Sequence, residues 1–222
     1  MRHVPHLFLG GPWESSELAL SDDQGRHLGR VLRLTDGAAV SYTDGAGARG
    51  EGELAGDFVR RGTETRIPRP TPEVTVAVAP PSKPNRARFL VEKLAELGVD
   101  RLIWLRTRHT EGRPPKPTKA EAWARSALEQ SQGTWVLQVE GPMTMGDLPM
   151  SPTLWVAERE TFPPPSVVEG GILVIGPEAG LAEGEAPQRA KRMSLGSRVL
   201  RVETAALVGA AILLDRSGRL NR

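Results

Sequence analysis

Residues 172–181 read ILVIGPEAGL and residues 195–205 read LGSRVLRVETA, and these two stretches decide the fold. In the first, four aliphatic residues lead directly into a turn, which is typical of a buried strand that ends at the edge of a parallel sheet. Gly176 and Gly180 keep that turn free of side chains, so a ligand can approach its backbone. The turn is either an ordinary tight turn, with Glu178 capping the next helix, or one wall of a binding site.

The second stretch begins with a similarly bare turn, Leu195-Gly196, and then carries Arg198, Arg201 and Glu203. Open α/β sheets bind ligands in the crevice beyond the carboxyl ends of their strands, so both turns are candidate ligand sites. No Lys-Ser/Thr pair follows the first turn, which excludes a phosphate-binding P-loop.

The segments around these stretches alternate between strand-like and helix-like patterns. Aliphatic runs predict strands at 74–80, 101–107, 135–140, 153–158 and 172–176. Apolar spacing and end signals predict helices at 84–98, 118–132 and 203–215. This alternation predicts an α/β domain with a mostly parallel sheet. The last helix is apolar nearly all round, so we expect a partner subunit to cover part of it.

A different pattern precedes the proline-rich connector at residues 66–72. Short strand-like runs alternate there with Gly/Asp turns, which predicts a small β-barrel. One helix is expected at 22–34, with Leu28, Val31 and Leu32 on one face. The predicted domains are therefore residues 1–68 and 73–222.

Composition and charge narrow the classes of function. The chain has no cysteine and only four scattered histidines, which argues against disulfides and a metal site and favours the cytoplasm. Apolar stretches are too short for a membrane span. Residues 81–119 carry 10 Lys/Arg against 4 Asp/Glu, and residues 191–222 carry 7 against 2. Such Arg-rich segments are compatible with nucleic acid, although GC-rich codon usage explains part of them.

Residues 44–50 match a dinucleotide-binding glycine pattern, but another strand-like run follows where that fingerprint needs a helix. We interpret them as a hairpin turn, and this argues against a nucleotide-dependent oxidoreductase.

The two opening stretches, in this order and spacing, resemble the small-subunit ribosomal RNA uridine-N3 methyltransferases (the RsmE family), whose pattern is a GPEGG-type loop followed by LGxRILRTETA. Supporting similarities are EKLAELGV (92–99), Glu129-Gln130-Ser131, HLGRVLRL (27–34) and the turn Asp36-Gly37. The resemblance therefore spans both domains. It implies a PUA-like barrel followed by a SPOUT methyltransferase domain with a deep trefoil knot, and a homodimer formed through the C-terminal domain.

The resemblance also implies a cofactor, S-adenosylmethionine, bound where three loops converge. The residues expected at that cofactor are Ala157, Glu158, Ile175, Gly176, Pro177, Glu178, Gly180, Ser194, Leu195, Gly196 and Leu200. Leu195 and Leu200 are expected to sandwich the adenine.

For catalysis, the expected candidates are Arg201 and Arg198, which would stabilise negative charge that develops on uracil N3 and its carbonyl oxygens. Glu203 could orient an arginine or accept the proton, or it could simply cap the last helix. The partner is expected to be ribosomal RNA or the small ribosomal subunit. The residues expected to contact RNA phosphates are Arg2, Arg26, Arg30, Arg33, Lys83, Arg86 and Arg88.

This sequence departs from the family pattern at several positions. Ala179 replaces a glycine, Leu181 a usual Phe and Val202 a usual Thr, and residues 132–134 lack the Arg that generally follows Glu-Gln-Ser. Two alternatives therefore stay open: a SPOUT enzyme that methylates another RNA position, and a non-catalytic RNA-binding protein of ribosome assembly.

Overall fold

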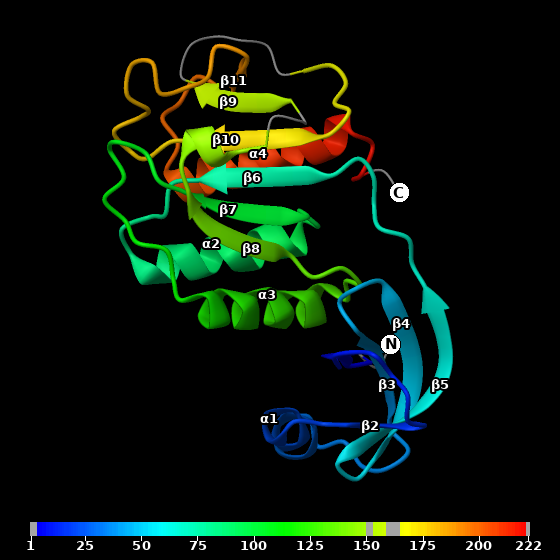
Figure 1. The fold of residues 1–222 in the computed structure, drawn as a ribbon. Helices are drawn as coiled ribbons and strands as arrows, with labels where there is room; N and C mark the ends of the chain where they lie inside the picture. Colours follow the sequence, from blue (N-terminus) through cyan, green and yellow to red (C-terminus); the bar gives the residue numbers. More distant parts are fainter. Residues whose placement is uncertain (1–3, 150–152, 159–164, 221–222) are drawn as a thin grey trace. The chain divides into compact units, whose positions relative to one another are not determined.

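A computed structural model describes residues 4–149, 153–158 and 165–220 of the chain (Figure 1). The chain forms two compact units. One unit comprises Met1–Arg69 and Leu128–Val136, and the other comprises Pro70–Ala127 and Leu137–Arg222. The first unit is therefore discontinuous, because residues 128–136 pack with it although the sequence assigned them to the second domain.

The first unit is built on a mixed five-stranded sheet in the order β1-β3-β4-β5-β2. Its strands are β1 His6–Phe8, β2 Glu17–Ala19, β3 Ala39–Thr43, β4 Ala48–Ala55 and β5 Phe58–Arg66. β1 and β3 are parallel, and the other pairs are antiparallel. Residues 44–47 join β3 to β4, and Asp44 Oδ1 accepts hydrogen bonds from the backbone N–H of Ala46 and Ala48 at 2.7 and 2.9 Å. The predicted hairpin turn is confirmed.

Tyr42 is fully buried at the centre of this unit. Its hydroxyl donates to Glu64 Oε1 at 2.8 Å, and Arg61 Nε donates to the same oxygen at 2.7 Å. Burial, and then the bond to Glu64, raise the pKa of Tyr42 to about 12. Gly50 has no room for a side chain because the Tyr42 ring lies against it.

The single helix predicted at 22–34 is only partly correct. Helix α1 (Asp22–Arg26) starts with a capping box between Ser21 and Gln24, and a π-turn, η1 (His27–Val31), follows it. The wider π-turn changes the spacing of side chains, so Leu28 is buried while Val31 is 65% exposed and Leu32 is 41% exposed.

The second unit is built on a six-stranded sheet in the order β11-β9-β10-β6-β7-β8, and every neighbouring pair is parallel. Its strands are β6 Val74–Val78, β7 Arg101–Leu105, β8 Gln138–Met143, β9 Leu154–Glu158, β10 Gly171–Ile175 and β11 Lys191–Ser194. A short 3-10 turn, Met145–Asp147, follows β8. The predicted α/β class is confirmed. β11 was not predicted, because a short edge strand that begins Lys-Arg carries little apolar signal.

In the described part of the chain after β6, the helices are α2 Pro84–Glu96, α3 Pro117–Ser131 and α4 Val202–Arg216. The last turn of α3, from Leu128, is counted with the first unit. α4 packs against α2, β6 and β10, as Figure 1 shows for α4 behind the sheet. At Gly209 the helix comes so close to β10 that an added Cβ would lie 2.6 Å from Leu173. Leu207, Val208 and Ile212 of α4 are only half-buried. The partner subunit expected over α4 stays a prediction, as does the trefoil knot.

The C-terminal end of α4 is anchored by a buried ion pair between Arg219 and Asp100, whose side chains are 6% and 3% exposed. Arg219 also donates to the backbone oxygens of Pro72 at 3.2 Å and Gly98 at 2.5 Å. Asp100 Oδ2 accepts a further hydrogen bond from Val74 N at 2.9 Å. This cluster fixes the segment after α4, at Arg219, to the start of β6. None of the helices in the described part of the chain is long and apolar enough to cross a membrane.

Candidate active site

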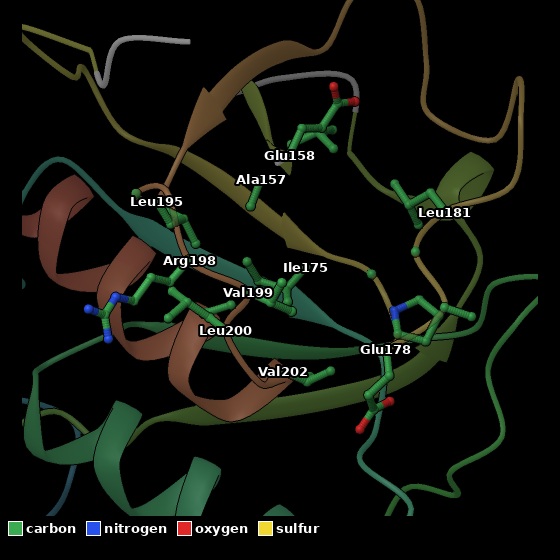
Figure 2. A pocket seen from close by; sticks show the side chains of 17 residues that line it. Ala157, Glu158, Ile175, Glu178, Leu181, Leu195, Arg198, Val199, Leu200 and Val202 are labelled. Atoms are coloured by element: carbon green, nitrogen blue, oxygen red, sulfur yellow. The ribbon is translucent and has the colours of Figure 1, made fainter. Parts of the chain in front are cut away.

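A cavity of about 430 Å³ opens at the carboxyl ends of β9 and β10, in the second unit (Figure 2). Three segments form it: the end of β9, the turn after β10, and the chain between β11 and α4. It is lined by Val156, Ala157, Glu158, Ile175, Gly176, Pro177, Glu178, Ala179, Gly180, Leu181, Leu195, Gly196, Arg198, Val199, Leu200, Val202 and Ala205. Residues 176–181 and 195–205, far apart in sequence, therefore meet at one place.

The local backbone explains why glycines occupy the turns. Gly180 and Gly196 have φ values of +77° and +118°, which side-chain-bearing residues rarely adopt. An added Cβ at Gly176 would lie 3.1 Å from Leu181 Cγ, so the turn folds tightly onto Leu181. At Gly196 an added Cβ would meet nothing within 4 Å, so that turn leaves open space beside the cavity.

Ser194 is the one residue expected at the cofactor that does not line this cavity. Its Oγ accepts a hydrogen bond from Gly196 N at 3.3 Å. Ser194 ends β11, which pairs with β9 through Ser194 and Glu158. This hydrogen bond holds the Leu195-Gly196 turn against the end of β11, and a contact of Ser194 with the cofactor stays a prediction.

The lining is apolar in its middle and charged at its edges. Figure 2 shows Ile175, Val199 and Leu200 in the middle of the cavity, with Arg198 extending to one side. Glu158 at the end of β9 accepts a hydrogen bond from Arg192 Nη1 at 2.8 Å, so its charge is partly neutralised. Glu178 lines the cavity and is exposed.

The three predicted catalytic residues lie in different surroundings. Arg198 lines the cavity and is exposed. Arg201 is not among the lining residues; it is the residue at the N-cap of α4, and its side chain makes no capping bond. Glu203 lies in the first turn of α4 and is buried, with Oε1 3.6 Å from Arg86 Nε. Its Oε2 is buried and has no hydrogen-bond partner among the described residues.

The predicted RNA-contacting residues lie in both units. Three of them already have carboxylate partners: Arg26 pairs with Asp23, Arg86 with Glu203, and Arg88 with Glu92. Arg30, Arg33 and Lys83 are exposed. Arg2 lies outside the described residues.

Glu129 of the Glu-Gln-Ser stretch accepts hydrogen bonds within the first unit. Its Oε1 accepts hydrogen bonds from Phe8 N at 2.8 Å and from Gln24 Nε2 at 3.3 Å. His6 also reaches this segment, with Nε2 3.0 Å from Gly133 O and Nδ1 2.8 Å from Ser41 Oγ. Burial lowers the pKa of His6 below its usual 6.5. Residues 128–136 are thus held by specific polar contacts.

Sequence reasoning missed several lining residues: Val156, Ala179, Leu181, Val199, Val202 and Ala205. All of them are small or aliphatic, and such residues carry no chemical signal of their own. Their proximity to the predicted loops in sequence is the only signal that could have found them. Within residues 4–149, 153–158 and 165–220, no group of three or more His, Cys, Asp or Glu is arranged to hold a metal ion.

Comparisons with known proteins agree with this arrangement. Residues 20–57 match the model of the RNA methyltransferase PUA domain, and residues 68–214 match that of the RNA methyltransferase domain. A solved structure described as a "probable rRNA-methyltransferase", from Porphyromonas gingivalis, is 26% identical with a TM-score of 0.82, over 93% of this chain and 95% of that one.

Ribosomal RNA small subunit methyltransferase E from Neisseria gonorrhoeae, solved bound to S-adenosyl methionine, shares the fold. Its TM-score is 0.80 at 22% identity, over 97% of this chain and 98% of that one. Because the RNA methyltransferase domain model covers well over half of the 222 residues, this chain belongs to the RNA methyltransferase family.

Proposed function

We propose that this protein uses S-adenosylmethionine to methylate N3 of a uridine in small-subunit ribosomal RNA. One observation carries the proposal: the GPEAG turn and the LGSRVLRVETA segment line the same cavity at the carboxyl edge of a parallel sheet. The family establishes an RNA methyltransferase. The choice of N3 of uridine rests on the resemblance to the uridine-N3 family, which HLGRVLRL (27–34) in the first unit favours over other SPOUT enzymes.

The residues of the cavity fit S-adenosylmethionine. Its volume of about 430 Å³ lies in the range of small-molecule sites. Leu195 and Leu200 offer apolar surfaces for the adenine, and the bare backbone at residues 176–180 offers N–H and C=O groups for its polar edge. When bound, the cofactor supplies a methyl group on a positively charged sulfur. Glu158 and Glu178 at the edge of the cavity suit a cation and would repel a phosphate chain.

The remaining task of the protein is to hold uridine N3 in line and to stabilise the anion that forms when N3 loses its proton. Arg198 is the better placed of the two predicted arginines, because it lines the cavity whereas Arg201 does not. Arg201 stands three residues along the same segment, where it can contact the RNA that enters the cavity. Glu203 is buried outside the cavity lining, with Oε1 3.6 Å from Arg86 Nε, so its part in the proposal is to orient an arginine and not to take the substrate proton directly.

We further propose that RNA reaches the cavity as an unstacked nucleotide, at a cost of a few kcal/mol, and that exposed cations such as Arg30, Arg33 and Lys83 contact its phosphates. A homodimer would cover the half-buried Leu207, Val208 and Ile212 of α4. The site of action would be the cytoplasm, where ribosomal subunits are assembled.

The test is to compare small-subunit ribosomal RNA from cells with and without this protein by nucleoside mass spectrometry. The proposal expects one 3-methyluridine to disappear with the protein and to return when the purified enzyme and S-adenosylmethionine are added. Loss of a different methylated nucleoside would refute uridine N3 as the methylated position but would support methylation of RNA by this protein. An unchanged set of nucleosides, together with no S-adenosylmethionine binding in calorimetry, would favour the non-catalytic alternative.

A further inference from the structure

A second cavity, of about 490 Å³, lies elsewhere in the second unit and shares no residue with the first. It is formed by the loop after β6, the start of α2, the loop after β7 and the start of α3. The residues that line it include Pro81, Gly112, Arg113, Lys116, Lys119 and Trp123. Since the loops follow the carboxyl ends of β6 and β7, the cavity opens at the same edge of the sheet as the first.

The walls of this cavity are built by close backbone contact. An added Cβ at Gly112 would lie 1.9 Å from Pro80 O and 2.8 Å from the backbone carbon of Pro81. The β7–α3 loop therefore lies directly on the β6–α2 loop, with no space for a side chain between them. This contact positions the two loops against each other at one wall of the cavity.

Positive charge dominates the rim. Arg113, Lys116 and Lys119 line the cavity together with one acidic residue, Glu111. In addition, α2 starts at Pro84 and α3 at Pro117, beside lining residues, and neither helix has an acidic residue in its first turn. The first turns of the two helices therefore add no negative charge of their own to the rim, and their dipoles add to the attraction of the basic side chains for an anion.

Trp123 gives the cavity an aromatic surface. Its side chain is half-buried in the second turn of α3, and the ammonium of Lys119 lies 5.6 Å from the centre of its ring. The ammonium lies over the ring in the free protein, and a phosphate that draws it aside would leave the indole to a flat base. The pair therefore matches the two parts of a nucleotide. Stacking on an aromatic side chain is the common way in which proteins hold unpaired bases of RNA.

The β7–α3 loop also connects the two cavities. At its start, Arg108 N donates to Glu185 Oε1 at 2.7 Å, and His109 Nδ1 lies 3.2 Å from Gly180 O, in the turn that lines the first cavity. Further along, residues 111–116 line the second cavity. One short loop thus contacts the wall of the candidate active site and forms the wall of the basic, aromatic cavity.

We propose that the second cavity binds a nucleotide of the RNA substrate next to the one that is methylated, with its base stacked on Trp123 and its phosphate held by Lys116, Lys119 and Arg113. This site would keep the RNA in place while the target uridine is unstacked. The inference rests on the proposed function only in taking RNA as the substrate, and it does not depend on which atom is methylated.

The test uses the full protein without cofactor and pentauridylate as the probe. The indole N–H resonance of Trp123 is assigned by its loss in Trp123→Phe, which retains an aromatic ring. Pentauridylate is expected to shift this resonance, and inorganic phosphate at the same concentration is expected to leave it in place. No shift with pentauridylate, or an equal shift with phosphate, would overturn the proposal, and the second result would mean an anion site only.

Charge variants separate a phosphate contact from general attraction. Lys116→Gln should weaken pentauridylate binding and reduce the slope of log affinity against log salt concentration by about 0.7, the value for one phosphate on a single strand. Trp123→Ala should weaken binding on the order of tenfold and leave that slope unchanged. The matched control is Arg125→Gln, on α3 but outside the cavity lining. If the control and Lys116→Gln gave the same loss, the site would be refuted.

The failures of the two proposals can be told apart. If Trp123→Ala and Lys116→Gln leave the KM for ribosomal RNA unchanged while methylation proceeds, only the second cavity is misassigned. If pentauridylate shifts the Trp123 resonance but no 3-methyluridine is made, only the proposed reaction is wrong.

Discussion

Replacing Arg198 by Gln is the sharpest test of the proposed chemistry, because this arginine is the one predicted catalytic residue that lines the cavity. A positive charge 4 Å from the anion at N3 and its carbonyl oxygens would contribute about 1 kcal/mol in bulk water and about 4 kcal/mol at the effective dielectric constant of a protein surface. At 1.36 kcal/mol per factor of ten, these limits correspond to about 5-fold and about 1,000-fold in rate. Since Arg198 is exposed until RNA covers the cavity, we expect a fall in kcat of at least about tenfold.

The assay is single-turnover transfer of a labelled methyl group to small-subunit RNA at saturating cofactor, with cofactor affinity measured separately by calorimetry. A chemical role predicts that Arg198→Gln recovers part of its rate as the pH rises, because N3 then loses its proton more readily in solution. Arg201→Gln should cost less, since that side chain lies outside the lining. Arg216→Gln, on an exposed residue at the end of α4, is the matched control. A kcat within twofold of wild type, or a loss explained fully by weaker cofactor binding, would refute the reasoning.

Three further predictions concern stability and the cofactor. Arg219→Met should lower the free energy of unfolding of the second unit by about 3–5 kcal/mol, because the buried Asp100 would lose the cation of this ion pair. In calorimetry, Tm should fall by roughly 10 °C. The control Arg216→Met removes an exposed ion pair and should lower the free energy of unfolding by less than about 1 kcal/mol. Burial depresses the pKa of His6 below 6.5, so the unfolded chain binds the proton more readily than the folded protein. The contribution of His6 to the free energy of unfolding should therefore be complete above about pH 6.5 and should fall as the pH drops toward the lowered pKa. In denaturant titrations the stability of His6→Gln should fall less steeply with decreasing pH, and a pH profile identical to that of the wild type would contradict the assignment. Gly196→Trp should abolish S-adenosylmethionine binding, because the indole would fill the open space beside the cavity. The control is Gly184→Trp, which should bind S-adenosylmethionine normally: Gly184 also has a positive φ and nothing near an added Cβ, but it lies outside the lining. Equal affinities of the two variants would mean that the cofactor binds elsewhere.

Much of the second unit could be predicted because its strands are aliphatic and its helices have clear ends. The strand at 171–175 and the helices α2 and α4 lie where the patterns placed them, and Gly98 ends α2 with a φ of +78° as its C-terminal glycine. The patterns could not find β11, whose first two residues are charged, because its place depends on pairing with β9. They also could not find the π-turn after α1, since the apolar spacing of Leu28, Val31 and Leu32 fits an α-helix of about 3.6 residues per turn.

For the candidate site, sequence located the loops and the structure located the side chains. The glycine turns could be found because glycine at a strand end has a specific backbone meaning, and Gly180 and Gly196 do have positive φ. The sequence could not show that Arg198 lines the cavity and Arg201 does not, because the directions of two side chains three residues apart on an irregular segment do not follow from their spacing. The ion pair between half-buried Arg86 and buried Glu203 could not be predicted either, since it joins two helices far apart in sequence.

The discontinuous first unit has a consequence for how the chain is made. Synthesis proceeds from the N-terminus, and domains generally fold in that order as they emerge. Here His6 and Phe8 cannot form their contacts with Gly133 and Glu129 until those two residues have left the ribosome. The first unit therefore completes its folding only after β6, α2 and β7 have been synthesised, and a fragment cut at the proline-rich connector would contain the sheet without the segment that closes its contacts.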